Sequence, residues 1–339
     1  MTRGWCVCVC LSLFFGLGLG LENYRWHHRY TRTPPVFYPT IYVDQSGHGN
    51  FTTIQSAIDS IPPNNKNWIC VYIKAGEYRE QVNIRDNRPF IYLKGEGKRK
   101  TSVVWGASGS ILTSPTFKCQ ADNIVVKSIG FRNSYNNPYT ESKLIRVAVA
   151  AMITGDKSAF YRCGFYGFQD TLWDVQGRHY FHRCTIQGAV DFIFGSGQSI
   201  YESCVISVTA GALRGLAGFI TAQGRKSPLE RNGFVFKNCY VVGTGRTYLG
   251  RPWGQYARVV FFNSFLSDVV IPQGWDAWEN IGHEYLLTFA ESGCYGRGAD
   301  PFGRVKWETK LSEEVLTWLT NIEYIDSEGW ISRQPFHAL

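Results

Sequence analysis

The fold is decided by the stretch Ala159-Phe-Tyr-Arg-Cys-Gly-Phe-Tyr166, which returns 21 residues later as Tyr180-Phe-His-Arg-Cys-Thr-Ile186. Each copy reads as a short strand in which apolar and polar residues alternate, followed by a small residue and a second apolar pair. A supersecondary unit that recurs with a period near 20 residues is typical of a solenoid, because one unit cannot bury its own apolar face.

Four further units of the same kind are found along the chain. They are Ile124-Val-Val-Lys-Ser-Ile-Gly-Phe131, Ile200-Tyr-Glu-Ser-Cys-Val-Ile206, Val235-Phe-Lys-Asn-Cys-Tyr-Val241 and Val260-Phe-Phe-Asn-Ser-Phe-Leu266. The steps from unit to unit are 35, 21, 20, 35 and 25 residues, so the long steps carry loops. We therefore predict an all-β fold, a right-handed single-stranded parallel β-helix. Its inward-facing ladder would be formed by Ser128, Cys163, Cys184, Cys204, Cys239 and Ser264.

Helical patterns occur only near the ends of this array. Ile54, Ala57, Ile58 and Ile61 lie on one face of a predicted helix over 53–61, which Pro62-Pro63 stops. We expect it to cap the open end of the solenoid. A second predicted helix over 311–319 would pack along the outside of the coils.

The chain has 339 residues, 44% hydrophobic and only 18% charged, which suits one large β-rich domain. We predict a signal peptide at residues 1–20, a basic N-terminal tail at 21–40 and the catalytic β-helix at 41–339. No membrane segment is expected after removal of the signal, so the protein would be secreted. The formal net charge of +8 suits an acidic partner such as an anionic polysaccharide, and nucleic acid is not expected.

Seven cysteines follow the predicted signal, with no Cys-x-x-Cys pair, which argues against a structural zinc site. Cys184 and Cys204 would lie on adjacent coils, about 4.8 Å apart, within reach of a disulfide. Cys163 competes for Cys184 on the same geometry, and a stack of free thiols is the alternative. The sequon Asn50-Phe-Thr52 predicts glycosylation at Asn50.

Two carboxylates repeat with the coils. Asp170 and Asp191 each follow a ladder cysteine, Cys163 or Cys184, by seven residues, and each lies in an apolar and aromatic segment. On successive coils they would face each other at about 5 Å. Two partly desolvated carboxyl groups this close cannot both ionise easily, so one would act as an acid and the other as a nucleophile. The alternative is a pair of structural aspartates that cap backbone amides.

The cation that keeps one carboxylate ionised is predicted to be Arg251, in Tyr248-Leu-Gly-Arg-Pro-Trp253. Trp253 in the same loop suits the face of a sugar ring. The alternative is a surface arginine beside a core tryptophan. Other catalytic motifs are absent from the sequence: no Gly-x-Ser-x-Gly, no His-Glu-x-x-His and no phosphate-binding loop.

Several of these segments resemble the signature motifs of plant pectinesterases (pectin methylesterases). They are Gly76-Glu-Tyr-Arg-Glu80, Gln169-Asp-Thr-Leu172, Asp191-Phe-Ile-Phe-Gly195 and Leu249-Gly-Arg-Pro-Trp253. The resemblance runs in order from about Ile41 to Trp330, and it implies a form without the inhibitor-like pro-region. The fold that it implies is a right-handed parallel β-helix, in agreement with the repeats.

The resemblance implies an aspartyl esterase of the cell wall that removes methyl esters from homogalacturonan (pectin) and releases methanol. Asp191 would attack the ester, Asp170 would act as general acid and then base, and Gln169 would donate to the oxyanion. Arg251 would orient Asp191. The expected sugar-binding residues are Arg251, Trp253, Trp173, Phe194 and Trp275. No metal or organic cofactor is implied, the expected state is a monomer, and a proteinaceous pectinesterase inhibitor is a further expected partner.

Val147 departs from the family pattern, because it stands where members carry a glutamine that helps to stabilise the oxyanion. Loss of one such donor can lower the rate by about 10²–10³. An alternative is therefore a pectin-binding wall protein of low or no activity. A second is a glycoside hydrolase on the same fold. A third, a pectate-lyase-like calcium enzyme, would need a cluster of acidic ligands that the central segment lacks.

Overall fold

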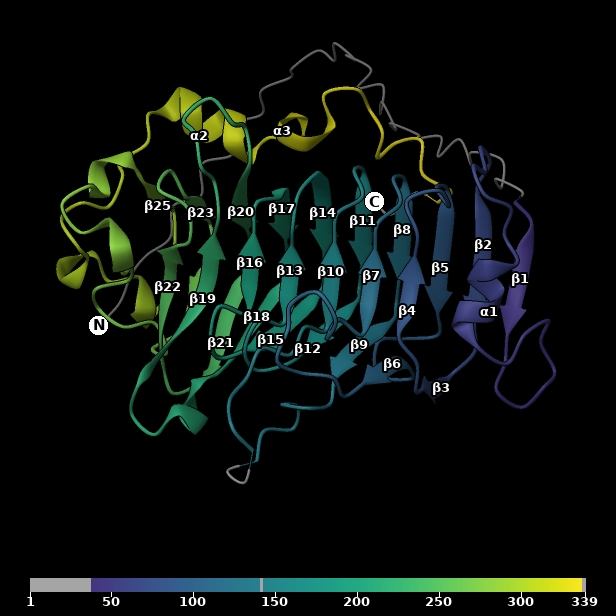
Figure 1. Cartoon of the computed structure of the whole chain (residues 1–339). Coiled ribbons are helices and arrows are strands. Elements are labelled where there is room, and N and C mark those ends of the chain that lie inside the picture. The colour runs from purple at the N-terminus through teal and green to yellow at the C-terminus, as the bar shows by residue number, and fades with distance from the viewer. Residues whose placement is uncertain (1–37, 141–142, 337–339) are drawn as a thin grey trace, which may run out of the picture. The chain divides into compact units, whose positions relative to one another are not determined.

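A computed structural model describes residues 38–140 and 143–336. In these residues the strands form three parallel sheets of ten, eight and seven strands, stacked coil upon coil (Figure 1). The predicted parallel β-helix is confirmed, because every pairing between strands is parallel and links one coil to the next. The predicted signal peptide and almost all of the basic tail fall within residues 1–37, outside the described part of the chain.

Within each sheet the strands follow one another in space in the order of the sequence. The ten-stranded sheet contains β1 (Thr40–Val43), β2 (Ile69–Ile73), β5 (Ile91–Gly95), β8 (Ile124–Lys127), β11 (Ser158–Tyr161), β14 (Arg178–His182), β17 (Gln198–Glu202), β20 (Gly233–Lys237), β23 (Arg258–Phe262) and β25 (Thr288–Ser292). The eight-stranded sheet contains β3 (Gly76–Tyr78), β6 (Thr101–Trp105), β9 (Gly130–Asn133), β12 (Gly164–Tyr166), β15 (Thr185–Gly188), β18 (Val205–Thr209), β21 (Tyr240–Thr244) and β24 (Phe265–Leu266). The seven-stranded sheet contains β4 (Val82–Ile84), β7 (Phe117–Cys119), β10 (Ala151–Ile153), β13 (Leu172–Asp174), β16 (Ile193–Gly195), β19 (Ala217–Gln223) and β22 (Arg246–Pro252).

Buried aromatic side chains are stacked from coil to coil inside the solenoid. Phe160, Phe181, Tyr201, Phe236 and Phe261 follow one another with ring centroids 5.1, 4.5, 4.6 and 4.4 Å apart. Their rings are within 12° of parallel, and each is fully buried. The repeated register of the parallel sheet places equivalent side chains above one another, so one aromatic column runs through five successive coils.

The predicted inner ladder is confirmed from Cys163 onward but is wrong at its first member. Ala159 pairs with Val125, so Ser128 aligns with Arg162 and Ile129 aligns with Cys163. Ile129 is buried, whereas Ser128 lies at the corner between two sheets with a left-handed φ of 60°. The alignment of the repeats predicted from the sequence was therefore wrong by one residue in this unit, and a shift of one residue moves Ser128 from the core to the corner.

The predicted disulfide between Cys184 and Cys204 is not formed, because both residues are free buried thiols. The Cys184 thiol donates to the Phe160 carbonyl, and the Cys204 thiol donates to the Phe181 carbonyl, each at 3.3 Å. Each sulfur is therefore directed at the backbone of the preceding coil rather than bonded to its neighbour in the ladder. Cys163, the alternative partner, is also free.

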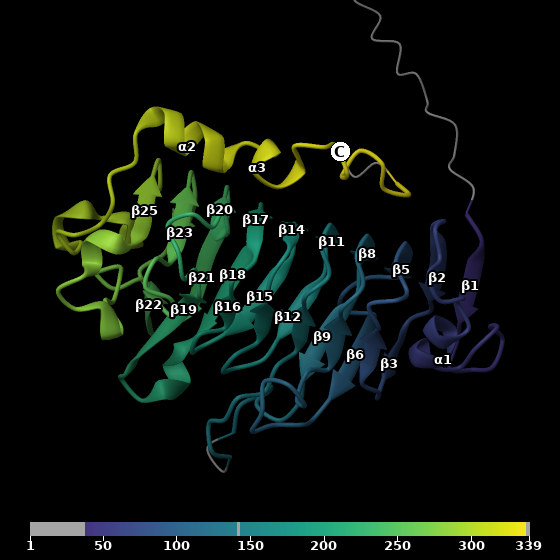
Figure 2. The ribbon, with the colours of Figure 1, turned by 45° about the horizontal axis from the view of Figure 1, so that its top comes forward.

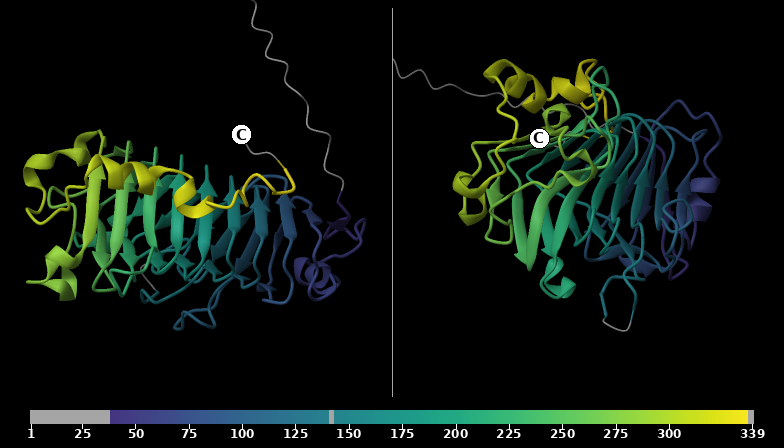
Figure 3. Two further views of the ribbon diagram at one scale, coloured as in Figure 1. Left: turned by 90° about the horizontal axis from the view of Figure 1, so that it is seen from above. Right: turned by 60° about the vertical axis from the view of Figure 1, so that its left-hand side comes forward.

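The helices are short, and α1 and α2 lie at the two predicted places, whereas α3 and the 3-10 helices were not predicted. Helix α1 (Ile54–Asp59) buries Ile54, Ala57 and Ile58 against the first coils. Helices α2 (Glu313–Thr320) and α3 (Glu323–Asp326) lie outside the ten-stranded sheet, where α2 contacts β20 and α3 contacts β14 and β17 (Figures 2 and 3). The 3-10 helices are η1 (Ala210–Leu213), η2 (Trp278–Asn280), η3 (Glu284–Leu286), η4 (Arg297–Ala299) and η5 (Pro301–Gly303). None of the described helices is long and apolar enough to cross a membrane.

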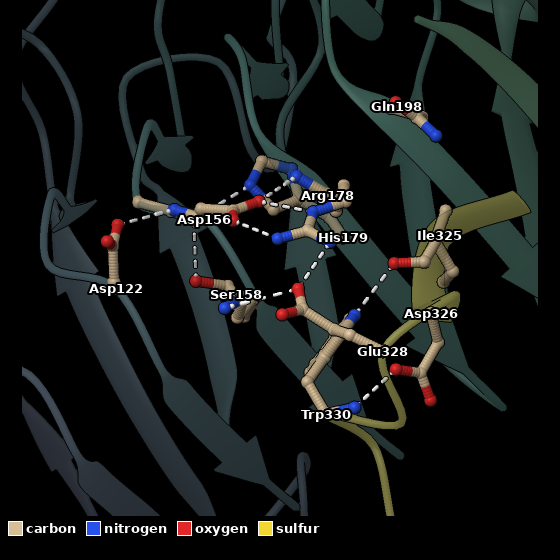
Figure 4. Close-up of polar contacts among 12 residues, drawn as sticks. Asp122, Asp156, Ser158, Arg178, His179, Gln198, Ile325, Asp326, Glu328 and Trp330 are labelled. Carbon is tan, nitrogen blue, oxygen red and sulfur yellow. Dashed lines mark hydrogen bonds and ion pairs between the residues drawn. The ribbon is translucent and has the colours of Figure 1, made fainter. Parts of the chain in front are cut away.

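The C-terminal segment after α3 is tied to the coils by polar contacts (Figure 4). Glu328 accepts from Arg178 at 2.6 Å and from Lys157 at 3.2 Å, and Arg178 also contacts Asp156. The Trp330 indole donates to the Ile325 carbonyl at 2.7 Å. Together with α2 and α3, this segment lies along the ten-stranded sheet (Figure 2).

Candidate active site

The two predicted carboxylates lie on adjacent coils, where the chain turns from the eight-stranded to the seven-stranded sheet. Asp170 lies between β12 and β13, and Asp191 lies between β15 and β16. Parallel pairing of Gln169 with Val190, and of Leu172 with Ile193, places the two aspartates opposite each other. Both have left-handed backbones, with φ of 59° and 46°. The same conformation recurs at other corners of the coils, for example at Ser128 and Ser203, so it is a property of the turns of this fold.

Arg251 of β22 holds Asp191 through two parallel contacts. Its Nε donates to Oδ1 at 2.8 Å, and its Nη2 donates to Oδ2 at 2.5 Å. The side chains of both residues are mostly buried, with 19% and 13% of their surfaces exposed. A bidentate pair shielded from water in this way is among the stronger ionic contacts in proteins. The structure thus brings together the three charged residues that the sequence singled out.

Two aromatic rings enclose the guanidinium of Arg251. The Arg251 Cζ atom lies 4.1 Å from the ring centroid of Phe219 and 4.1 Å from that of Trp278. We call Phe219 and Trp278 the aromatic clamp. These ring contacts favour the cation, while its Nε and Nη2 groups donate to Asp191.

The aromatic clamp was missed in the sequence, and a neighbouring tryptophan was chosen instead. Trp275 is wrong as a sugar-binding residue, because its ring is only 1% exposed and packs on Phe289 at 4.7 Å inside the core. Trp278, three residues later at the start of η2, is 37% exposed. The backbone of Trp278 has a left-handed φ of 46°, which directs its ring away from the side on which the Trp275 ring enters the core. In the sequence, the only feature that could have indicated Trp278 was its spacing of three residues from Trp275.

The two carboxyl groups differ in what acts on their pKa values. Burial raises the pKa of Asp170 to about 7, with a further rise from the charge of Asp191 and an opposing effect from Arg251. Burial also raises the pKa of Asp191, while its hydrogen bonds and ion pair with Arg251 oppose that rise. The guanidinium binds Asp191 directly, so Asp191 is the carboxyl group whose ionised form has a cationic partner, whereas Asp170 has none in direct contact.

A row of outward-facing residues in the seven-stranded sheet leads to Arg251. Met152, Trp173, Phe194, Ala222 and Arg251 are paired successively across β10, β13, β16, β19 and β22. The rings of Trp173 and Phe194 are stacked, 5.6 Å apart and 8° from parallel. Both are nearly buried in a small apolar cluster that is separate from the main core.

Trp253 extends this aromatic row into solvent. Its ring lies 6.0 Å from that of Phe194 and is 50% exposed. Three of the four predicted sugar-binding aromatic residues, Trp173, Phe194 and Trp253, are therefore contiguous, and the exposed face belongs to Trp253. An exposed indole next to buried rings provides a rigid apolar surface on which a sugar ring can stack.

Val147 and Gln169 lie on neighbouring coils beside the carboxylates. The Ala148 amide donates to the Gln169 carbonyl at 3.3 Å, which places Val147 next to the catalytic turn. The Val147 side chain packs against the cluster of Trp173 and Phe194 and offers no donor. The Gln169 amide group has no hydrogen-bond partner within residues 38–140 and 143–336, and the side chain is only partly buried.

Metal ions in proteins are bound mainly by His, Cys, Asp and Glu side chains. The described part of the chain contains no group of three or more His, Cys, Asp or Glu side chains that could hold a metal ion. The polar groups that the site brings together are two carboxyl groups, one guanidinium and the Gln169 amide.

Comparisons with known proteins agree with this geometry. The family model described as Pectinesterase matches residues 40–328. Probable pectinesterase 29 of Arabidopsis thaliana is 58% identical over 308 residues, which cover 89% of this chain and 92% of the relative. Probable pectinesterase 55 of the same plant is 56% identical over 302 residues, with 88% and 92% covered. The structure of pectin methylesterase from carrot superposes with a TM-score of 0.81 at 29% identity, covering 88% of this chain and 97% of the carrot chain. The chain, a parallel β-helix enzyme, belongs to the pectinesterase family.

Proposed function

We propose that this protein hydrolyses the methyl esters of homogalacturonan with Asp191 as nucleophile and Asp170 as general acid and base. The observation that carries the proposal is the asymmetry of the pair. Asp191 is bound in bidentate fashion by Arg251, whereas Asp170 is buried beside it with a pKa raised to about 7. One ionised and one protonated carboxyl group are the two forms that acyl transfer from an ester requires.

In the first half-reaction an Asp191 oxygen adds to the ester carbonyl carbon, and the carbonyl oxygen becomes an oxyanion. The Gln169 amide, which has no other hydrogen-bond partner in the described chain, donates to that oxyanion. The tetrahedral intermediate collapses as the C–O bond to the methoxy group breaks, and Asp170 transfers its proton to the departing methanol. The product of this step is an anhydride between the galacturonate carboxyl and Asp191.

In the second half-reaction the ionised Asp170 removes a proton from water, and the hydroxide adds to the acyl carbon. Collapse releases the free galacturonate, restores the Asp191 carboxylate to Arg251 and leaves Asp170 protonated for the next cycle. Trp253, half exposed beside Phe194, provides the surface against which the sugar stacks.

The test is methanol release from highly methyl-esterified pectin by the full chain and by Asp191→Ala. We expect the variant to lose at least ~10³-fold in kcat/KM, because no other carboxylate can replace the nucleophile. Asp268→Ala is the matched control, since Asp268 is exposed and distant in sequence from the pair. Equal rates for Asp191→Ala and the parent chain would refute the assignment.

Two other functions remain distinguishable in the same assay. New reducing ends without methanol would identify a glycoside hydrolase, which a pair of close carboxylates also suits. Binding to pectin with neither product would identify a wall protein that Val147 has left inactive. Cell-wall localisation and secretion are part of the proposal. They are supported by the plant pectinesterase relatives and are tested by the location of a tagged full-length chain.

A further inference from the structure

A second charged feature lies on the other side of β12 from the catalytic carboxylates. Arg162 and Arg183 occupy the same corner of two successive coils, where the chain turns from the ten-stranded to the eight-stranded sheet. Both side chains are exposed, and both backbones are left-handed, with φ of 54° and 55°. Arg162 precedes β12, and Asp170 follows it, so the arginines and the carboxylates lie toward opposite ends of the strands β12 and β15.

Two lysines of the preceding coils continue the row. Lys94 pairs with Lys127 in the ten-stranded sheet, and Lys127 pairs with Tyr161, the neighbour of Arg162. We call Lys94, Lys127, Arg162 and Arg183 the basic corner. It presents one cation per coil along four successive coils, and the coil spacing is about 4.8 Å.

These cations are not neutralised by the rest of the described chain. None of the four has an ion pair with a carboxylate within residues 38–140 and 143–336. Burial lowers the pKa of Lys127, and the like charges of Arg162 and Lys94 lower it further. Lys127 lies 4.2 Å from the ring centroid of Phe336 and Lys94 lies 5.2 Å from that of Tyr72, but neither contact neutralises the charge. A cluster of cations without a carboxylate partner is a surface that an external polyanion would stabilise.

The row ends at the coils on either side. The coil before Lys94 places the uncharged Tyr72 beside it, and the coil after Arg183 carries Glu202, which contacts Lys237. The unneutralised stretch therefore spans about four coils. Its repeat distance is comparable to the length of one sugar ring, so a linear polymer with one carboxylate per sugar matches both its direction and its spacing.

We propose that the basic corner is a second binding site, which takes a de-esterified stretch of galacturonan along the solenoid axis. It lies outside the catalytic pair and binds the anionic product rather than the neutral methyl ester. A chain held there does not cover Asp170, because the eight-stranded sheet lies between this corner and the turn that carries Asp170. The enzyme would then remain attached to de-esterified regions while it acts on neighbouring esters. The inference rests on the proposed esterase function only for the choice of polyanion.

The test compares the double variant Arg162→Ser/Arg183→Ser with Arg297→Ser/Lys306→Ser. Serine already occupies this corner with left-handed φ at Ser128 and Ser203, so the first variant retains the local backbone. Arg297 and Lys306 are exposed and lie after β25 at the other end of the solenoid, so the control loses the same charge.

Binding of the full chain to immobilised polygalacturonate is measured over a NaCl series. Each exposed ionic contact contributes about 0.2–1 kcal/mol, so the corner variant should bind roughly 2- to 30-fold more weakly and with a smaller salt dependence. The control should bind as the parent does. Methanol release from a short methyl-esterified oligogalacturonide should be the same for all three proteins.

Equal affinity of the two double variants would overturn the proposal, since binding would then reflect net charge alone. Loss of esterase activity in the corner variant would also overturn it, because the arginines would then act through the catalytic site. If the parent and the control variant bind polygalacturonate, the corner variant binds it weakly and none of the three releases methanol, the esterase proposal fails and the second site stands.

Discussion

Replacing Arg251 tests the central electrostatic claim, that a guanidinium keeps the buried Asp191 carboxylate ionised. We choose Arg251→Met, which preserves much of the length of the side chain and removes its charge. Without the two contacts of 2.8 and 2.5 Å, burial alone acts on Asp191 and raises its pKa further. An opposite charge at this distance typically lowers a carboxyl pKa by about 1–3 units, so its loss should raise the value by a similar amount.

The sign of the effect on activity follows from the protonation state that the nucleophile needs. Asp191 must be ionised, so the acid limb of kcat/KM against pH should move upward by about 1–3 pH units in Arg251→Met. At a pH below the shifted limb, the rate should fall roughly tenfold for each unit. In the parent protein the alkaline limb should lie near 7, where Asp170 loses its proton. The two limbs describe the coupled pair rather than either residue alone.

The assay is the pH dependence of methanol release from a short methyl-esterified oligogalacturonide, with thermal unfolding measured at each pH. Arg251→Lys is the matched control, because it keeps the charge but loses the bidentate contact, and its acid limb should move by less. If Arg251→Met lowered kcat while the acid limb stayed at the parental pH, the guanidinium would act on the substrate and not on Asp191, and the electrostatic argument would be refuted.

Four further outcomes are expected. Val147→Gln should raise turnover by up to about 10²-fold, because it adds an oxyanion donor beside the catalytic turn, and an unchanged rate in the methanol assay would contradict this. Trp278→Leu removes one face of the aromatic clamp, so it should move the acid limb upward by less than Arg251→Met does, whereas a purely structural role would lower stability and leave the pH profile in place. Burial raises the pKa of Asp170 to about 7, above its unfolded value near 4, so the free energy of unfolding should fall as the pH rises from 4 to 7. Asp170→Asn should remove up to about 4 kcal/mol of that fall. Denaturant titration at pH 4 and pH 8 measures the difference. Alkylation of the unfolded chain without reductant should modify both Cys184 and Cys204. If mass spectrometry showed both residues unmodified, the predicted disulfide between them would be supported after all.

The sequence by itself determined the repeat, and with it the β-helix and the position of the Asp170–Asp191 pair. Equal spacing of Asp170 and Asp191 from their cysteines is a one-dimensional property, and parallel stacking of coils converts it directly into proximity. The loop that carries Arg251 was also readable, since its residue types suit a carboxylate partner.

Only the tertiary structure decided which neighbouring side chains reach the site and which enter the core. Trp275 and Trp278 are chemically the same and three residues apart, yet a left-handed backbone at Trp278 puts one ring on Arg251 while the other fills the core. Ser128 and Ile129 exchanged places in the ladder for a similar reason, because a register shift of one residue reverses which side chain points inward. Composition and spacing do not encode the φ of single corner residues, and in a solenoid those corners decide what each coil presents to the solvent.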